Sequence, residues 1–275
     1  MAVPSGRSIQ GVAAVAETFR RAHDEGRAAL IPFFTAGYPS LAVLPELLRA
    51  AEDAGADLVE VGIPFSDPLA DGPMLQKAAA TALAGGVRVD AILDILARTK
   101  TEIPRVFLTY VNPVLRRGFD RFADNAVASG MAGAIVPDLP WTEARALRRA
   151  FSARGLAVIP LVAPTSTDAH LAALRSADGF VYAVSVTGVT GARQSVAGDL
   201  ETLVARIRQA VPLPVAVGFG IATPEHAQAI GQFADGVIVG SALTEAIMRR
   251  PQAPAEATYA FLRPMAEALA RARGD

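Results

Sequence analysis

Three acidic residues that follow one another closely are the groups most able to do chemistry in this chain. Glu60 lies in a short apolar run that reads as a strand, and Asp67 and Asp71 follow in the next loop. Strand side chains alternate between two faces, so Val59 and Val61 share one face and Glu60 takes the other. The branched face suits packing against a helix, which turns Glu60 toward the interior of a sheet or barrel. A lone carboxylate there costs roughly 2–7 kcal/mol unless it is paired or protonated.

These acids also have simpler explanations. Glu60 could be a structural buried acid bonded to a backbone N–H or to a tyrosine hydroxyl. The Asp67-Pro68 pair commonly makes a turn, and Asp71 precedes a glycine, which is also turn chemistry. The functional interpretation of Asp71 depends on its sharing a short loop with Glu60. Together the acids favour general acid–base catalysis by carboxylates.

The sequence does not favour catalysis by a cysteine nucleophile, by a lysine Schiff base or by a bound metal. The chain has no cysteine, which excludes disulfides, thiolate metal sites and a cysteine nucleophile. The only lysines, Lys77 and Lys100, fall outside the predicted strands, so a Schiff base with a substrate is disfavoured. The histidines are scattered over predicted helices (His23, His170 and His226) and offer no cluster of metal ligands. We therefore expect no metal and no cofactor in this chain.

Composition narrows the class of protein. The 275 residues include 52% hydrophobic residues and carry a net charge of −1, which predicts a substantial core and no basic stripe. Nucleic acid and anionic membranes are therefore not expected as partners. No run of 18 uncharged apolar residues suggests a membrane span, and the absence of cysteine suits a reducing cytoplasm. We see no linker, so we expect residues 1–275 to form one domain in the cytoplasm.

Short apolar strands alternate with helical patterns along the whole chain. Such alternation, repeated eight times over about 250 residues, predicts a (β/α)8 TIM barrel. The alternative is an open doubly wound sheet, but that fold usually has a phosphate loop after its first strand, and this sequence has none there. We also expect an extra N-terminal helix and an inserted helix around 73–84, after strand 2. The predicted strands are 28–36, 57–63, 105–111, 133–137, 157–162, 180–185, 214–219 and 236–240.

In such a barrel the active site lies where the strands end. The candidates at the ends of strands 1 to 6 are Phe33, Glu60, Leu108, Tyr110, Asn112, Asp138 and Tyr182. The last three loops are rich in glycine and run into helices, and free N–H groups at such turns attract anions. We therefore predict that a phosphate monoester is held by Gly191, Gly220, Gly240 and Ser241. As alternatives, the glycines could serve only tight turns, the tyrosines could be core residues, and Asp138 could cap a helix.

At this point the motifs resemble a known family. The segment PFSDPLADGP (64–73), preceded by VEVG, resembles the signature of the tryptophan synthase α chain. Six further motifs match in order: IPFFTAGYPS (31–40), LTYVNPVLRRG (108–118), VPDLP (136–140), VSVTGVTGAR (184–193), GFGI (218–221) and GVIVGSA (236–242). The resemblance implies a barrel that cleaves indole-3-glycerol phosphate to indole and glyceraldehyde 3-phosphate. It also implies a partner, a β chain that uses pyridoxal phosphate, in an α2β2 heterotetramer.

The resemblance assigns roles to individual residues. Glu60 is implied as the proton shuttle, Asp71 as the partner of the indole N–H, and Tyr182 as a neighbour of the scissile side chain. The implied indole pocket consists of Phe33, Tyr110 and Phe219. The implied phosphate cradle consists of Gly191, Gly220, Gly240 and Ser241. The residues implied in loop closure are Asp67 and Thr190, and those implied in contact with the β chain are Pro64, Asn112 and Pro113.

The implied reaction is consistent with the absence of a suitable lysine and of a cluster of metal ligands. Retro-aldol cleavage needs an electron sink, and with neither an imine nor a metal the substrate must supply it. Protonation of indole at C3 creates such a sink. A buried Glu60 is suited to act as the acid, because burial raises the pKa of a carboxyl group. Asp71, as an anion, is suited to stabilise the positive charge that develops at the indole N–H. The alternatives are a sister barrel such as indole-glycerol phosphate synthase, a free-standing lyase, and a catalytically silent activator of a β chain.

Overall fold

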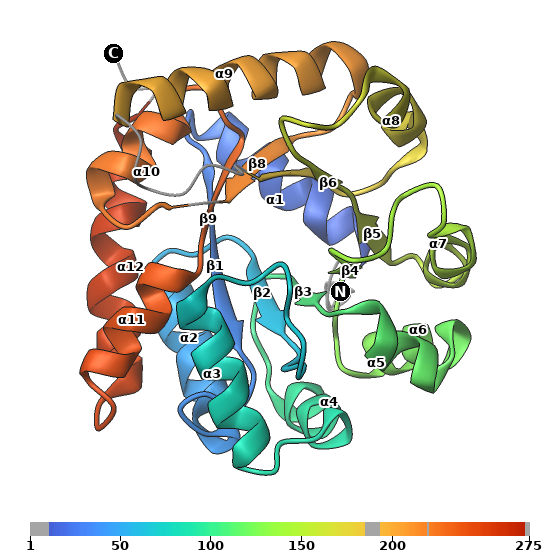
Figure 1. Ribbon diagram of the computed structural model, residues 1–275. Helices are drawn as coiled ribbons and strands as arrows, with labels where there is room; N and C mark the ends of the chain where they lie inside the picture. The colour runs from blue at the N-terminus through green and yellow to red at the C-terminus, as the bar shows by residue number, and fades with distance from the viewer. Residues whose placement is uncertain (1–10, 185–192, 219, 273–275) are drawn as a thin grey trace, which may run out of the picture.

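The chain folds as a ring of parallel strands, shown in Figure 1. The computed structural model describes residues 11–184, 193–218 and 220–272. This part of the chain contains nine parallel strands in one sheet, in the order β5-β4-β3-β2-β1-β9-β8-β7-β6. They are β1 (Ala29–Thr35), β2 (Val59–Gly62), β3 (Arg105–Leu108), β4 (Gly133–Ile135), β5 (Ala157–Ile159), β6 (Leu161–Val162), β7 (Val181–Val184), β8 (Val215–Gly218) and β9 (Gly236–Val239).

The two ends of this sheet are halves of a single segment. Only Pro160, which has no N–H to donate, separates β5 from β6. β5 pairs with β4 on one side, and β6 pairs with β7 on the other. The Pro160 carbonyl still accepts a hydrogen bond from the Tyr182 N–H at 2.9 Å. The segment predicted as one strand at 157–162 therefore closes the ring, which confirms the predicted eight-stranded barrel and excludes the open sheet.

Helices cover the outside of the ring. Apolar residues of the strands' outer faces form one core cluster with residues of the surrounding helices. The α-helices of the described chain are α1 (Val12–Asp24), α2 (Leu44–Asp53), α3 (Pro73–Ala84), α4 (Val89–Arg98), α5 (Val111–Arg117), α6 (Phe119–Ala128), α7 (Arg145–Ser152), α8 (Asp168–Ala173), α9 (Arg193–Ala210), α10 (Pro224–Gly231), α11 (Ser241–Arg249) and α12 (Pro254–Ala270), with 3-10 turns η1 (Leu41–Val43) and η2 (Leu174–Ser176).

The N-terminal helix closes one end of the barrel. Val15 and Phe19 of α1 belong to the apolar cluster inside the ring, together with Leu58 and Phe180 of the strand segments. The rings of Phe19 and Phe180 lie 5.2 Å apart. Leu58 and Phe180 lie directly before β2 and β7, so α1 covers the end of the barrel at which the strands begin. The opposite end, where the strands finish, is left for the site. The extra N-terminal helix and the inserted helix α3 are both confirmed.

Helix α5 corrects the prediction at the third strand. The strand ends at Leu108 rather than at residue 111, and Tyr110 caps a helix that contains Asn112 and Pro113. A proline near the start of a helix loses no hydrogen bond, because the first N–H groups have no partner within the helix. The helix stops at Gly118, which has a φ of 83°. Arg116 and Arg117, directly before this glycine, are the pattern in the sequence that indicates a helix end.

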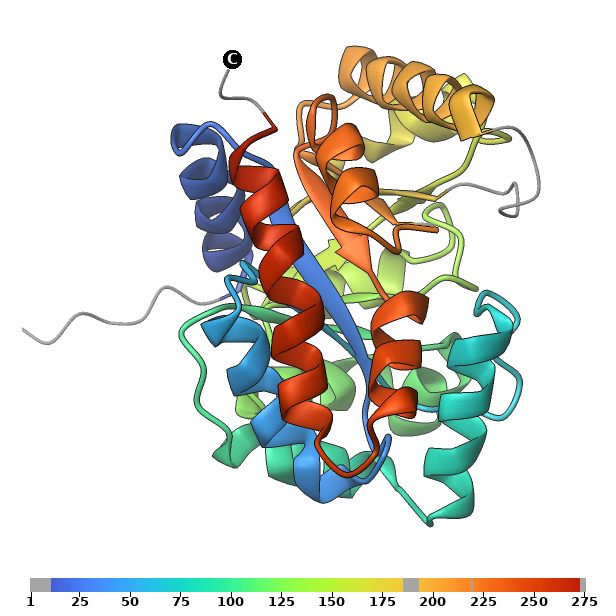
Figure 2. The same cartoon turned by 90° about the vertical axis from the view of Figure 1, so that its left-hand side faces the viewer.

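Helix α12 is the second element that the sequence reading missed. It begins at Pro254, contains Pro264, and packs against α2, α10, α11 and β1. Figure 2 shows it lying alongside β1. An internal proline removes one hydrogen bond and normally breaks a helical pattern. Tertiary packing overrides that local preference here, since Leu262 and Met265 on either side of Pro264 are fully buried.

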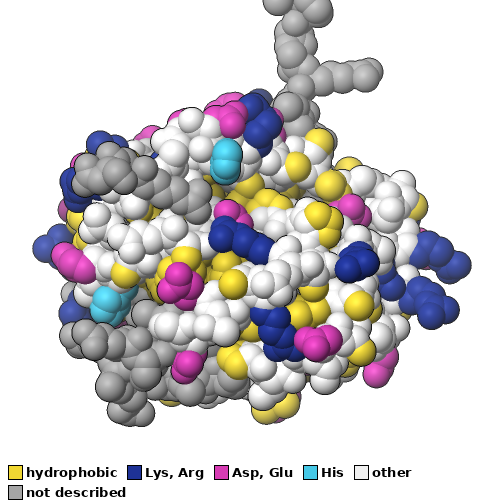
Figure 3. Space-filling model, turned by 90° about the horizontal axis from the view of Figure 1, so that it is seen from above, with side chains coloured by type: hydrophobic (Ala, Val, Ile, Leu, Met, Phe, Trp, Pro, Cys, Tyr) yellow, Lys and Arg dark blue, Asp and Glu magenta, His cyan; other side chains and the backbone are white. Residues whose placement is uncertain are grey.

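The outer surface carries mixed charge. On the face shown in Figure 3, dark blue basic and magenta acidic side chains are interspersed among apolar groups. Within the described residues, no helix has the length and hydropathy needed to cross a membrane.

Candidate active site

Glu60 lies on the inner face of β2. In register it is level with Phe33 on β1 and Val106 on β3. Leu58, two residues earlier, belongs to the cluster inside the ring, whereas Val59 and Val61 pack with the outer helices. The predicted inward orientation of the acid is therefore confirmed. The alternation of strand side chains is what places it there.

The environment of Glu60 is dry and offers no compensation. Its side chain is 0% exposed, and neither carboxylate oxygen has a hydrogen-bond partner among the residues that the structure describes. No backbone N–H or tyrosine hydroxyl of the described residues bonds to this acid, so the alternative of a structural, hydrogen-bonded acid finds no support there. Burial raises the pKa of Glu60 from 4.5 to about 8, because the charged form is poorly solvated. The carboxyl group consequently carries its proton at neutral pH.

Asp71 lies in the loop after β2 and is held by Tyr110. The Tyr110 hydroxyl donates a hydrogen bond to the Asp71 carboxylate and accepts one from the Ala70 N–H at 3.1 Å. The Tyr110 ring stacks on Phe65 with ring centroids 5.3 Å apart. Partial burial raises the pKa of Asp71 to about 6, and the hydrogen bond from Tyr110 opposes that rise. Asp71 is thus mostly an anion at the pH at which Glu60 is mostly protonated.

Tyr182 shares this site. It lies on the inner face of β7, level with Ala216 of β8. Burial raises the pKa of its hydroxyl well above the usual value, and the negative charges of Glu60 and Asp71 raise it further. Since both acids act on the same phenol, the three predicted catalytic side chains lie close to one another at the barrel mouth.

Two glycines whose role the sequence did not predict make room for the aromatic side chains. A Cβ atom at Gly62 would lie 2.4 Å from the Phe33 ring, and one at Gly218 would lie 2.3 Å from the Tyr182 hydroxyl. Both glycines occupy inward positions at strand ends. The GFG motif indicated Gly218, but only as part of a turn. The contact between Gly218 and Tyr182 depends on strand register, which the motif does not show.

The described part of the predicted phosphate cradle lies at two helix starts. Gly240 precedes Ser241, the first residue of α11, and Gly220 has a φ of 66° shortly before α10. The first N–H groups of a helix have no partner within it and favour anions. The loop after β2 reaches this place, since a Cβ atom at Gly72 would lie 3.8 Å from Ser241 Oγ. Three predicted residues, Thr190, Gly191 and Phe219, lie outside the described residues.

The remaining predicted residues have identifiable surroundings. Asp138 accepts a hydrogen bond from the Val111 N–H at 2.8 Å, so it supports the start of α5, not of the helix after its own strand. Leu108 belongs to the inner cluster. Asp67 accepts a hydrogen bond from the Ser66 hydroxyl. A groove of about 550 Å³ is lined by Pro64 in the loop after β2, by Asn112 and Pro113 of α5, and by residues of α3 and α4.

Fold and site together define a (β/α)8-barrel enzyme whose mouth holds a dry acid, a second carboxylate on a loop, and helix starts suited to an anion. Comparison with known proteins narrows this class. The sequence profile of the family described as Tryptophan synthase alpha chain matches residues 19–270. This chain therefore belongs to the tryptophan synthase alpha chain family, and it is a lyase that cleaves indole-3-glycerol phosphate.

Individual relatives agree with the family assignment. The tryptophan synthase alpha chain of Microcystis aeruginosa is 47% identical over 236 residues, which cover 84% of this chain and 89% of that one. The Synechocystis protein of the same name is 45% identical, with 93% and 99% covered. A solved alpha chain from Legionella pneumophila superimposes with a TM-score of 0.85 at 34% identity, covering 93% and 97%. A tryptophan synthase structure from M. tuberculosis gives 0.84 at 37%, covering 93% and 98%.

Proposed function

We propose that Glu60 supplies the proton that makes cleavage possible. Its carboxyl group would protonate C3 of the indole ring, which forms a C–H bond and leaves a cationic indolenine. The resulting Glu60 carboxylate would then take the proton of the neighbouring glycerol hydroxyl. The bond between C3 and the glycerol carbon breaks, its electron pair returns to the ring, and indole and an aldehyde form. The observation that supports this role is the burial of a carboxyl group without any partner, at a pKa of about 8.

Asp71 is suited to the second electrostatic task. Positive charge develops on the ring N–H when C3 is protonated, and a carboxylate that is already ionised stabilises it without reorganisation. The hydrogen bond from Tyr110 keeps Asp71 in place and favours its ionised form. Phe33 and Tyr110 would form walls of the indole pocket, together with Phe219. Tyr182 would lie beside the scissile side chain, and Leu108 and Asp138 would line the site.

The phosphate of the substrate would be held by the glycine turns. Gly240, Ser241 and Gly220 offer backbone N–H groups and a hydroxyl at the starts of α10 and α11, and Gly191 would complete the cradle. Asp67 and Thr190 would link the loops after β2 and β7 when the site closes over the substrate. Such closure would exclude water from the cationic intermediate.

We further propose that this chain has no cofactor of its own and works in the cytoplasm in an α2β2 heterotetramer with a β chain that carries pyridoxal phosphate. Membership of the family implies the β chain. The groove that contains Pro64, Asn112 and Pro113 is the proposed docking face. Leu115 of α5, a helix that lines this groove, is 53% exposed, and Leu69 in the loop after β2 is 90% exposed. Apolar groups so exposed are common at protein interfaces.

The role of Glu60 is tested by comparing the wild type with Glu60→Gln and Asp71→Asn. We expect Glu60→Gln to fold and to lose at least about 10³-fold in cleavage rate, since one acid–base group contributes about 10²–10⁴. Asp71→Asn should retain the substrate phosphate site and lose rate as well. Indole release should be measured for the isolated chain and with a β chain present, which separates a free-standing lyase from a subunit. A Glu60→Gln protein that cleaves near the wild-type rate would refute the assignment.

A further inference from the structure

A second cavity lies on the outer wall of the barrel, away from the mouth. It has a volume of about 240 Å³, and its walls come from α7, from η2 and from the segment around β5. Val158 of β5 lines it and belongs to the outer core cluster, on the opposite face of the sheet wall from the inner cluster. The cavity is therefore separated from Glu60 by the barrel wall. The reaction proposed above uses none of its residues.

Arg148 is the unusual group in this cavity. Its guanidinium carbon lies 4.3 Å from the centre of the Trp141 ring. The indole N–H of Trp141 donates to the Ala173 carbonyl at 3.0 Å, which fixes the ring beneath the cation. The Nε of Arg148 is buried and has no hydrogen-bond partner in the described part of the chain, and Nη1 reaches Ser176 Oγ only at 3.5 Å. A buried donor without a partner is costly, so this cation is held in place yet incompletely bonded.

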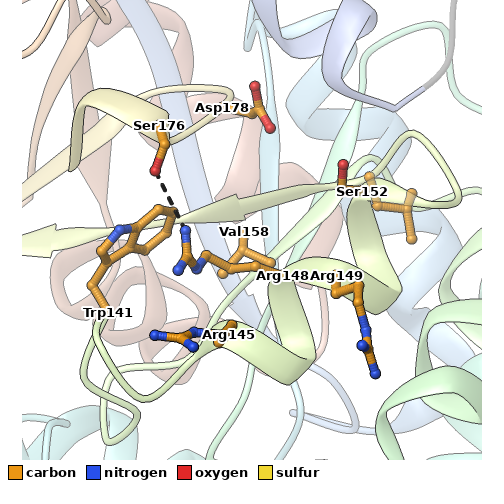
Figure 4. Close-up of a pocket in the computed structure, with 9 residues that line it drawn as sticks. Trp141, Arg145, Arg148, Arg149, Ser152, Val158, Ser176 and Asp178 are labelled. Carbon is orange, nitrogen blue, oxygen red and sulfur yellow. Dashed lines mark hydrogen bonds between the residues drawn. The ribbon is translucent and has the colours of Figure 1, made fainter. Parts of the chain in front are cut away.

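A second cation lies one turn away on the same helix. Arg145 lines the cavity, and in Figure 4 its guanidinium group points to the end of the cavity where Trp141 and Arg148 lie. Arg149 points away from them in the same view. Neither Arg145 nor Arg148 has an ion pair with any residue that the structure describes. Arginines nearby behave differently, since Arg154 pairs with Asp120 and Asp124, and Arg206 pairs with Asp168.

We propose that this cavity binds the phosphate group of a small phosphate monoester between Arg145, Arg148 and the hydroxyl of Ser176. Two guanidinium groups and a hydroxyl offer several donors to one oxyanion, and charge-assisted bonds from arginine to phosphate are among the strong hydrogen bonds of proteins. An anion would also relieve the repulsion between two like charges three residues apart on a helix. The apolar side chains of Leu156 and Val158 would contact the short carbon chain of the ester. Asp178 also lines the cavity, and its carboxylate would repel an anion that lay close to it.

The test must keep the two phosphate sites apart. The barrel mouth is first saturated with a non-cleavable indole-alkyl phosphate, and glycerol 3-phosphate and inorganic phosphate are then titrated in separate calorimetric experiments. In the blocked wild type we expect one remaining binding event per chain for glycerol 3-phosphate. Inorganic phosphate should bind more weakly, because it lacks the carbon chain. Absence of that event overturns the proposal, and equal affinity for the two probes overturns the assignment to an ester.

Three variants locate the event. Arg148→Gln should weaken glycerol 3-phosphate binding by about 10-fold or more, and Arg145→Gln, at an exposed position, should weaken it several-fold. Arg98→Gln is the matched control, since Arg98 is an exposed arginine at the end of α4, far from the cavity in sequence. It should bind as the wild type does. All three should cleave indole-3-glycerol phosphate normally, so failure here leaves the role of Glu60 untouched. Wild-type affinity in both Arg145→Gln and Arg148→Gln would refute the site.

Discussion

Gly218 leaves the space that the hydroxyl group of Tyr182 occupies. A Cβ atom at position 218 would lie 2.3 Å from this oxygen and 2.7 Å from the ring carbon that carries it. The two residues lie on neighbouring strands and face the same interior, so the absence of a side chain on one sets the position of the other. Gly62 and Phe33 form a second pair of this kind, since a Cβ atom at position 62 would lie 2.4 Å from the Phe33 ring.

The first prediction concerns this contact. In Gly218→Ala the Tyr182 ring must move, since the contact would be with a phenol fixed by the barrel wall. Misplacement by about 1 Å in an active site costs up to about 10²-fold in rate, and we expect kcat/KM to fall by roughly 10- to 100-fold while the protein still folds. Gly198→Ala is the control, because a Cβ atom there meets nothing within 4 Å. Normal activity in Gly218→Ala would show that Tyr182 has no positional role.

The second prediction is a bell-shaped pH dependence of kcat/KM. Glu60 must be protonated to act as an acid, so the rate should fall as pH rises through about 8, its pKa. Asp71 must be ionised, so the rate should fall as pH drops through about 6. The optimum should therefore lie near neutrality. The profile should be measured with the isolated chain, and a rate that keeps rising well above pH 8 would contradict the role of Glu60.

The third prediction separates Tyr110 from a mere wall of the pocket. Its hydroxyl stabilises the ionised form of Asp71, so Tyr110→Phe should raise the pKa of Asp71. The acid limb of the pH profile should then move to higher pH, while the alkaline limb stays in place. Tyr259→Phe, at a position of α12 that is 42% exposed, should leave both limbs unchanged. An acid limb that does not move in Tyr110→Phe would mean that this hydrogen bond does not govern Asp71.

The fourth prediction tests the docking face. Leu115 is 53% exposed on α5, a helix that lines the groove, and Leu115→Glu would place a charge in the proposed interface with the β chain. Burying an unpaired charge is costly, so association should weaken by at least about 10-fold. Val127→Glu serves as the control, because Val127 is 44% exposed at the far end of α6. Equal elution of both variants with a β chain in size-exclusion chromatography would exclude this face.

Local sequence patterns were sufficient to predict the barrel. Short apolar runs located the strands, and the alternation of Val59, Glu60 and Val61 gave the inward direction of the acid. The two missed helices each contain a proline, Pro113 in α5 and Pro264 in α12. Local rules treat proline as a helix breaker. In α5 the proline costs no hydrogen bond, because it lies near the helix start. In α12 tertiary packing compensates for the lost hydrogen bond. The local sequence shows neither the helix start nor the packing.

The sequence predicted that Glu60, Asp71 and Tyr182 lie together, but it did not predict their contacts. Motifs at strand ends identified Glu60, Asp71 and Tyr182, because parallel strands bring their ends together. The hydrogen bond of Tyr110 to Asp71 and the fit of Gly218 against Tyr182 depend on barrel closure and on strand register. The cation of Arg148 over Trp141 gave no signal either, since it joins residues of a loop and a helix outside the barrel wall.

The central claim is that Glu60 bears a proton at neutral pH because it is buried without a partner. Infrared difference spectroscopy of the wild type against Glu60→Gln, recorded across a pH titration, observes that carboxyl group directly. We predict a protonated-carboxyl band that is present at pH 7, is missing in the variant, and disappears at about pH 8. A Glu60 that is already ionised at neutral pH, with no such band above about pH 5, would contradict the account.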